Sequence, residues 1–139
     1  MKTLVAAAAT TLVLIGFSAP ADDSAAVAQA QVAARSWLAL TDGGKYGESW
    51  DSASSLSKSA VTKPDWEKAI KAGRGQLGAL KARKVKSATF TRTLPGAPDG
   101  EYVVIQFESQ FENKAAAIET VTPTREKDGA WRVSGYYIK

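Results

Sequence analysis

The spacing of hydrophobic residues changes part-way along the chain. From residue 22 to residue 78 apolar side chains recur every three or four positions, which is the spacing of one face of an α-helix. From residue 85 onward apolar and polar residues alternate, which is the spacing of a β-strand with one buried face. Helices that precede strands in this way predict an α+β fold, in which the helices pack on one face of an antiparallel sheet.

Three helices are predicted before the strands. The first spans residues 22–40, where alanine, the best helix former, is abundant. The second spans residues 45–54, and the segment SLSKSA (55–60) is expected to be a loop. The third begins at Thr62, an N-cap residue with an acidic partner three positions on, and ends near Gly78. Glycines close to its end predict the close approach of another backbone; they are Gly73, Gly75 and Gly78.

Four strands joined by short turns are predicted after the helices. In the last of them Trp131, Val133 and Tyr137 are expected to share one face. The connection at residues 95–100 is interpreted mainly as a rigid corner, although exposed loops of this kind also carry functional sites. The order of the strands predicts a curved four-stranded meander. The strands span residues 85–94, 101–111, 115–126 and 130–139.

The first 21 residues have the features of a secretory signal peptide. Lys2 forms a short positive region, an uncharged apolar run spans residues 4–17, and small residues follow at Ala19 and Ala21. Cleavage after Ala21 would leave residues 22–139 as a single domain, located in the periplasm or secreted. The apolar run is shorter than the about 20 residues that a transmembrane helix needs, so no membrane span is expected after cleavage. The alternative is an uncleaved N-terminal anchor.

Composition narrows the chemistry that the chain can perform. The sequence contains neither histidine nor cysteine, which excludes Ser-His-Asp and Cys-His catalysis and the usual zinc or copper sites. We therefore expect no cofactor and no metal. An exported chain without disulfides fits a bacterial periplasmic protein better than a secreted eukaryotic domain.

The net charge of +4 comes partly from one basic run, KARKVK (81–86). A basic run can bind phosphates. We interpret this one as a solvated helix end that continues into a strand. Because exported proteins rarely meet nucleic acid, none is expected as a partner.

Aromatic and charged side chains near the boundary between helices and sheet are the candidate binding residues. Most of the four tryptophans are expected in the core, and some are expected to line a pocket. Arg74 adjoins the apolar stripe of the third helix, so its charge either faces inward or stays in solvent above the stripe. An inward-facing Arg74 needs a partner, expected to be Glu119, Glu48 or Asp51, or it receives an anionic ligand. The expected ligand-binding set is Trp37, Tyr46, Trp50, Arg74, Tyr102 and Glu119, with no catalytic or metal-binding residue.

Several longer motifs occur in a characteristic order: GKYGESW (44–50), LPGAPDGEYVVIQFESQFENK (94–114), AIETVT (117–122) and DGAWRVSGYYI (128–138). On these motifs the chain resembles, over roughly residues 30–139, the bacterial family of domain of unknown function 4019. The resemblance implies an exported or membrane-tethered module. By architecture it also implies a cone similar to nuclear transport factor 2 and cystatin, with a curved sheet wrapped over helices around a cavity. The family has no assigned activity, so the resemblance implies no catalytic residues.

Three functions remain open from the sequence. The first is a non-catalytic periplasmic module that binds a small molecule or an envelope protein, in a cavity between helices and sheet or on the open face of the sheet. The second is a small enzyme of isomerase or hydratase type, which requires its polar groups to converge in one pocket. Those groups are Arg74, Tyr46, Tyr102 and Glu119. The third is a structural envelope or stress protein. Whether the chain is an enzyme stays undecided, and the missing catalytic residues favour binding.

Overall fold

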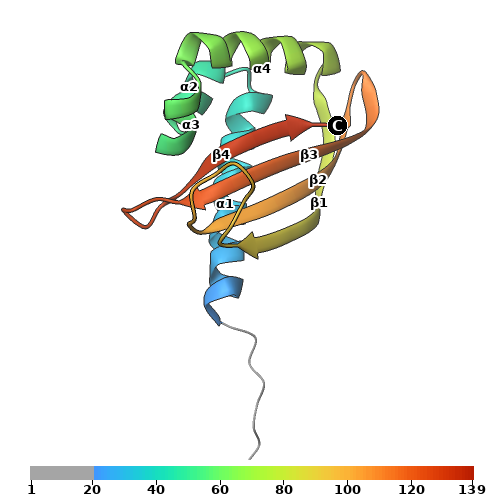
Figure 1. Ribbon diagram of the computed structural model, residues 1–139. Coiled ribbons are helices and arrows are strands. Elements are labelled where there is room, and N and C mark those ends of the chain that lie inside the picture. The colour runs from blue at the N-terminus through green and yellow to red at the C-terminus, as the bar shows by residue number, and fades with distance from the viewer. Residues whose placement is uncertain (1–20) are drawn as a thin grey trace, which may run out of the picture.

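The computed structural model describes residues 21–139 as helices followed by one antiparallel sheet (Figure 1). The sheet order is β1-β2-β3-β4, so the predicted α+β fold and the four-stranded meander are confirmed. Apart from Ala21, the predicted signal peptide lies outside the described residues. The elements are α1 (Ala21–Asp42), α2 (Tyr46–Asp51), α3 (Ser55–Ala60), α4 (Lys63–Leu77), β1 (Leu80–Thr91), β2 (Tyr102–Phe111), β3 (Lys114–Arg125) and β4 (Trp131–Ile138).

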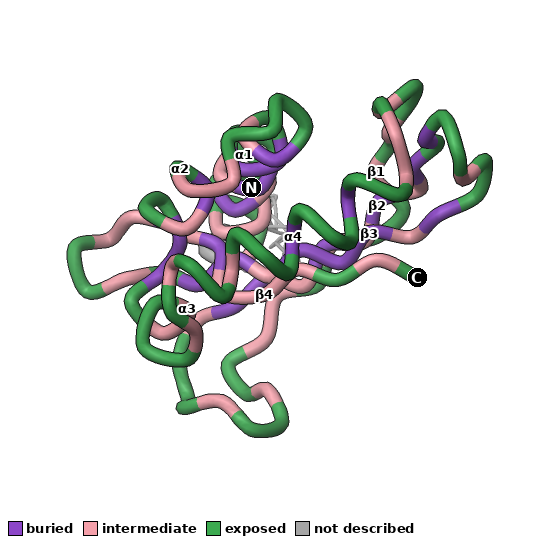
Figure 2. Tube along the Cα trace, turned by 90° about the horizontal axis from the view of Figure 1, so that it is seen from above, coloured by how far each residue is buried: buried purple, intermediate pink, exposed green. Residues whose placement is uncertain are grey.

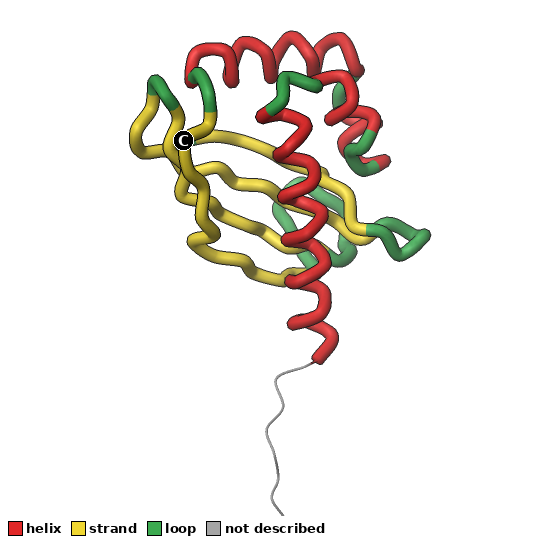
Figure 3. The backbone as a smooth tube through the Cα atoms, turned by 180° about the vertical axis from the view of Figure 1, so that it is seen from behind, coloured by secondary structure: helices red, strands yellow, loops and turns green. Residues whose placement is uncertain are grey.

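One long helix covers the inner face of the sheet. α1 crosses this face and contacts all four strands (Figure 3). Ala30 and Ala34 are completely buried on it, and such small side chains let a helix pack close to a sheet. The core between the two layers also contains Trp37, Leu38, Val103, Ile105, Phe107 and Val121. None of the helices between residues 21 and 139 is both long and apolar enough to cross a membrane.

The segment predicted as a loop at residues 55–60 is a helix, α3. Its serines suggested a loop because serine competes with helix formation through local hydrogen bonds. The same chemistry starts the helix here, since the side chain of Ser54 accepts a hydrogen bond from the backbone N–H of Ser57 at 3.1 Å. Ser54 also donates its own N–H to the carbonyl of Val133 at 2.9 Å. This bond fixes α3 to the outer edge of β4.

The helix predicted from Thr62 to near Gly78 is confirmed as α4. Thr62 is the N-cap, and its side chain accepts from the N–H of Asp65 at 3.3 Å. Gly78 ends the helix with a φ of 73°. The predicted close approach of another backbone is right at Gly78, because the N–H groups of Glu112 and Asn113 donate to backbone carbonyls on either side of it at 2.8 Å. It is wrong at Gly73 and Gly75, which are exposed and where an added Cβ would meet nothing within 4 Å. Much of the surface of α4 is exposed (Figure 2).

The basic run at residues 81–86 was predicted as a helix end that continues into a strand; the helical part is wrong, and the strand begins earlier than expected. It lies within β1, which begins at Leu80. Two register shifts interrupt the pairing of β1 with β2, between Leu80 and Ala82 and between Val85 and Ser87. Extra residues of this kind redirect the side chains that follow them. Within this run the side chain of Arg83 is mostly buried, at 10% exposure, whereas that of Lys84 is 78% exposed.

A β-bulge in β4 changes which tyrosine faces the core. Thr122 pairs with Gly135 but the next residue of β3 pairs with Val133, so one residue of β4, Ser134, is extra. Because side chains alternate along a strand, this extra residue moves all later side chains to the opposite face. Tyr136 therefore packs against the core, and Tyr137 is 60% exposed. The expectation that Tyr137 shares a face with the residues before the bulge is wrong.

Candidate functional site

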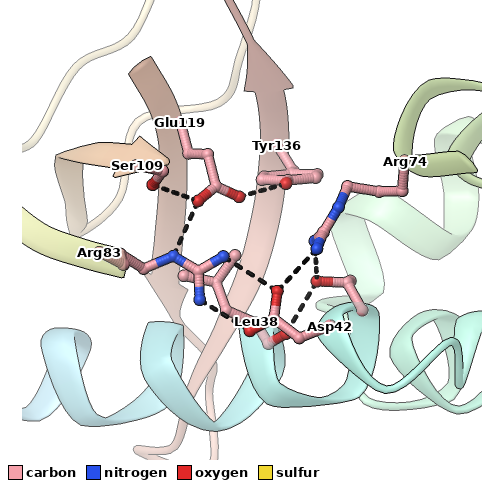
Figure 4. Close-up of polar contacts among 8 residues, drawn as sticks. Leu38, Asp42, Arg74, Arg83, Ser109, Glu119 and Tyr136 are labelled. Carbon is pink, nitrogen blue, oxygen red and sulfur yellow. Dashed lines mark hydrogen bonds and ion pairs between the residues drawn. The ribbon is translucent and has the colours of Figure 1, made fainter. Parts of the chain in front are cut away.

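A buried carboxylate on the inner face of the sheet organises the polar residues of the fold. Glu119 lies on β3 and is fully buried. One of its oxygens accepts hydrogen bonds from Nε of Arg83 on β1 at 2.7 Å and from the hydroxyl of Ser109 on β2 at 2.5 Å. The other accepts a hydrogen bond from the hydroxyl of Tyr136 on β4 (Figure 4). All four strands therefore meet at this carboxylate.

Two arginines connect the carboxylate to the end of α1. Arg83 donates to both carboxylate oxygens of Asp42, at 2.7 and 3.0 Å. Arg74 on α4 donates to Asp42 at 2.8 Å and to the hydroxyl of Thr41 at 3.0 Å. Asp42 thus fastens α1 to both β1 and α4. We call the whole set the buried polar network: Thr41, Asp42, Arg74, Arg83, Ser109, Glu119 and Tyr136.

The protonation states of the network follow from its contacts. Burial tends to raise the pKa of Asp42, but hydrogen bonds from Arg83 and Arg74 outweigh it and hold that pKa below its ordinary value. Burial raises the pKa of the Tyr136 hydroxyl far above its ordinary value, and the neighbouring charge of Glu119 raises it further. Tyr136 is therefore a neutral donor at physiological pH.

The two arginines stay charged despite their burial. Burial tends to lower the pKa of Arg83, but Asp42 and Glu119 outweigh it and raise that pKa. Burial likewise tends to lower the pKa of Arg74, and there Tyr136 together with the two carboxylates outweighs it. The network then holds two positive side chains and two carboxylates, so its charges cancel. Paired buried charges of this kind make costly defects when one partner is removed. The network is suited to holding the helices on the sheet.

Of the two orientations that the sequence left open for Arg74, the structure has the inward one, because the residue is only 5% exposed. Its expected direct partners were wrong. Arg74 binds Asp42 and Thr41, whereas Glu119 binds the other arginine. Asp42 was overlooked because its sequence, TDGG, was assigned to the turn after the first helix. α1 continues through Asp42, which places this carboxylate against α4 and β1.

The aromatic residues of the predicted binding set do not line one common pocket. Trp37 is buried and donates its Nε1–H to the carbonyl of Ser49 at 2.8 Å, and Trp50 donates to the carbonyl of Val61 at 2.9 Å. Both line a hollow of about 360 Å³ between the short helices and β4. Tyr46 packs against the core from α2, and it lines a different hollow, at the start of α4.

Tyr102 lies at one end of β2, whereas Glu119 lies near the middle of β3. It pairs with Thr124, whereas Glu119 pairs with Phe107, five residues further along β2. That separation is about 16 Å along a strand. The Tyr102 hydroxyl donates to the carbonyl of Pro98 at 2.5 Å, so the connection between β1 and β2 folds back over this tyrosine. The four polar groups of the enzyme hypothesis therefore do not converge in one pocket.

A groove opens beside the buried polar network, and we call it the α4–β4 groove. α4 runs alongside β4 at the edge of the sheet (Figures 1 and 3). The groove between them has a volume of about 410 Å³, which is within the range of ligand sites. Its apolar walls come from Trp66, Ile70 and Leu77 on one side and from Tyr136 and Ile138 on the other.

The charged side chains that line the groove, within the described part of the chain, are all cationic. Arg74 belongs to the buried polar network, and Lys114 and Lys139 stand at the ends of β3 and β4. Arg74 also carries a buried Nε that has no hydrogen-bond partner among residues 21–139. Residues 21–139 contain no cluster of acidic side chains arranged to hold a metal ion.

The family model described as "Protein of unknown function (DUF4019)" matches residues 33–136. The chain belongs to this family. The matched region contains every member of the buried polar network. No curated protein and no solved structure matches the chain. The predicted likeness to the nuclear transport factor 2 cone therefore stays a prediction.

Proposed function

We propose that this DUF4019 chain is an exported, non-catalytic binding module whose ligand occupies the α4–β4 groove. The observation that carries the proposal is the composition of the groove. It has apolar walls and a buried arginine, Arg74, whose Nε–H has no partner in the described structure. A buried donor without a partner costs about 1–3 kcal/mol.

The state of the polar side chains supports binding over catalysis. Glu119 is fully buried and accepts three hydrogen bonds from side chains of the fold, so its carboxylate is not exposed to a ligand in the groove. The pKa of Tyr136 is raised by burial, so this hydroxyl does not act as a base near neutral pH. Tyr46 and Tyr102, the other expected catalytic groups, lie elsewhere. A rigid neutral network beside an open apolar groove fits a module that holds a ligand.

Export is part of the same proposal. Its support is the sequence of residues 1–21, with a positive start, an uncharged apolar run and small residues before the expected cleavage point. The ligand is then a molecule of the periplasm or of the extracellular medium.

Two matched glycines allow the groove to be tested. Gly73 lines the groove and Gly75 does not, yet both are exposed on α4 with open space where a side chain would begin. Gly73→Leu should therefore fill the groove, whereas Gly75→Leu should change only the helix. Both variants gain a better helix former, so both should fold.

The experiment is a thermal-shift screen of the wild type and both variants against a panel of periplasmic metabolites, short-chain and medium-chain carboxylates and synthetic peptides. A ligand at one hundred times its Kd adds about 2.7 kcal/mol of stability. The expected result is a set of compounds that raise the Tm of the wild type and Gly75→Leu but not that of Gly73→Leu. If no compound gives this pattern, the groove is not a binding site and the proposal is wrong.

A further inference from the structure

The backbone of β4 is open toward the α4–β4 groove. Ile118 and Lys139 exchange both of their backbone hydrogen bonds, each at 2.9 Å. In an antiparallel ladder such pairs alternate with pairs whose N–H and C=O groups point away from each other. Two residues of β4 are at these alternate positions: Tyr136 and Ile138. They lie opposite Val121 and Glu119, respectively. Their N–H and C=O groups therefore point out of the sheet, toward the side on which α4 lies.

Only the first part of this edge is covered within the described structure. The carbonyl of Val133 accepts a hydrogen bond from Ser54, and the side chains of Ser54 and Ser134 are 2.7 Å apart. From Gly135 onward, the backbone N–H and C=O groups of β4 that point away from β3 form no backbone hydrogen bond with another described residue. The open part coincides with the residues of β4 that line the groove, Tyr136 to Ile138.

The other edge of the sheet is protected in a different way. β1 carries lysines at positions 81, 84 and 86 and has two register shifts in its pairing with β2. Charged side chains and bulges are the usual devices that prevent an edge strand from pairing with another chain. The open part of β4, residues 135–138, contains no charged residue. The β1 edge is therefore protected against pairing with another strand, whereas the open part of β4 is free to accept one.

We propose that the occupant of the α4–β4 groove is an extended, acidic peptide segment that pairs with β4 as a fifth strand. This inference deepens the proposed function and rests on it. The N–H and C=O groups of Tyr136 and Ile138 bind the peptide backbone, and the apolar wall of α4 receives alternate side chains of the peptide. Strand addition of this kind obtains its affinity from main-chain hydrogen bonds and its specificity from side-chain pockets.

The charge of the groove selects an acidic segment. Lys114 and Lys139 flank the open edge, and both side chains are positive. Arg74 lies in the wall of the groove, but its charge is balanced by Asp42. Opposite charge guides the encounter of two chains, and like charge opposes it. A second copy of this chain would bring the same cationic side chains to the contact. An acidic partner segment is therefore favoured over pairing between two copies.

The test uses two peptides of the same length and apolar content, acetyl-EVEVEVE-amide and acetyl-KVKVKVK-amide, with decanoate as a small amphiphilic anion. Binding is measured by titration calorimetry against the wild type, Gly73→Leu and Gly75→Leu. Hydrogen exchange of the backbone amides, followed by NMR, reports which residues become protected. A version of the acidic peptide N-methylated at alternate residues removes one row of its hydrogen-bond donors.

The acidic peptide is expected to bind the wild type and Gly75→Leu at least about tenfold more tightly than the basic peptide or the N-methylated peptide. It is expected to protect the amides of Tyr136 and Ile138, and to lose at least about tenfold in affinity to Gly73→Leu. Equal binding of both charges, or binding without protection of these two amides, overturns the inference.

Decanoate separates this inference from the proposed function. If decanoate binds the wild type but not Gly73→Leu, and no peptide protects the β4 amides, the groove is a ligand site and the strand-addition inference is wrong. If neither peptide nor decanoate binds and the panel gives no ligand, both proposals fail. Protection of the same amides that rises with protein concentration, together with dimers in sedimentation equilibrium, overturns the inference in favour of self-pairing.

Discussion

Nε of Arg83 lies 2.7 Å from Oε1 of Glu119, although β2 separates the strands that carry the two residues. The arginine side chain crosses the inner face of β2, where Ser109 donates to the same oxygen. A surface pair of this kind would contribute little. This pair has side-chain exposures of 10% and 0%, so the loss of either partner leaves the charges of the buried polar network unbalanced.

We predict that Glu119→Gln lowers the free energy of unfolding by about 3 kcal/mol or more, because it removes one of two carboxylates that balance two buried arginines. The measurement is urea unfolding followed by tryptophan fluorescence. The matched control is Glu108→Gln, whose ion pair with Lys84 is 44% and 78% exposed. The control should change stability by less than about 1 kcal/mol. Equal effects of the two variants would contradict the structural role of the network.

A second prediction concerns acid. The pKa of Asp42 is lower in the folded chain because Arg83 and Arg74 donate to its carboxylate. Its stabilising contribution is therefore fully present above the ordinary aspartate pKa of about 3.9 and is lost as pH falls through the lower, folded value. Asp42→Asn should be less stable than the wild type at pH 7, with a smaller difference at pH 3. Urea unfolding across this range measures it, and a constant difference would contradict the assignment.

A third prediction concerns alkali. The pKa of Tyr136 is raised in the folded chain by burial and by Glu119. The stability that this hydroxyl contributes is therefore fully present below the ordinary tyrosine pKa of about 10. It is lost as pH rises toward the folded value, because in that range Tyr136 ionises in the unfolded chain but not in the folded chain. The loss of stability above pH 10 should be smaller in Tyr136→Phe than in the wild type. Tyr137→Phe is the control, since Tyr137 is 60% exposed.

The fourth prediction compares two glycines of the same segment. Gly78 has a φ of 73° and a ψ of −159°, a conformation that is close to exclusive to glycine, and an added Cβ would lie 2.9 Å from Glu112. Gly78→Ala should therefore destabilise the chain by about 1–3 kcal/mol. Gly75→Ala should stabilise it by up to about 1 kcal/mol, since the position is helical and open. Thermal unfolding of both variants decides between these signs.

The fifth prediction tests export. Expressed in a bacterial host, the chain should be recovered from the periplasm or the medium with Asp22 as its first residue. N-terminal sequencing and intact-mass measurement give the answer. Replacing a small residue of the cleavage motif, as in Ala19→Arg, should leave the leader attached. A full-length chain in the cytoplasm would contradict the proposal.

The alternating and three-to-four-residue patterns carried enough information to predict the fold. The capping sequence at Thr62 and the alternation of Val103, Ile105 and Phe107 are local signals, and the structure bears both out. Helix α3 was missed because the serine that caps it, Ser54, belongs to a segment whose composition favours loops. Local propensity could not predict this helix, because the hydrogen bond of Ser54 to β4 that supports it is a long-range contact.

The polar network was predicted only in part, for a geometric reason. An inward-facing Arg74 was one of the two orientations that the helix spacing allowed, and it is the one observed. The partnership with Asp42 depended on how far α1 continues, and helix ends are among the least certain features of a sequence. Arg83 was obscured by its basic neighbours, and Tyr136 by the bulge at Ser134, which no simple alternation reveals. Ser109, in contrast, has the same spacing as the buried residues of β2 and could have been found.

The bulge at Ser134 makes the end of β4 sensitive to its register. Pairing Ser134 with Thr122 would close the bulge, turn Tyr137 toward Glu119 and expose Tyr136 on the outer face. The same change of register would reverse which backbone groups of β4 face α4. Deleting Ser134 would instead leave Tyr136 opposite Val121. Members of the family that lack the extra residue are therefore expected to keep both the tyrosine contact to the buried carboxylate and the present orientation of the open strand edge.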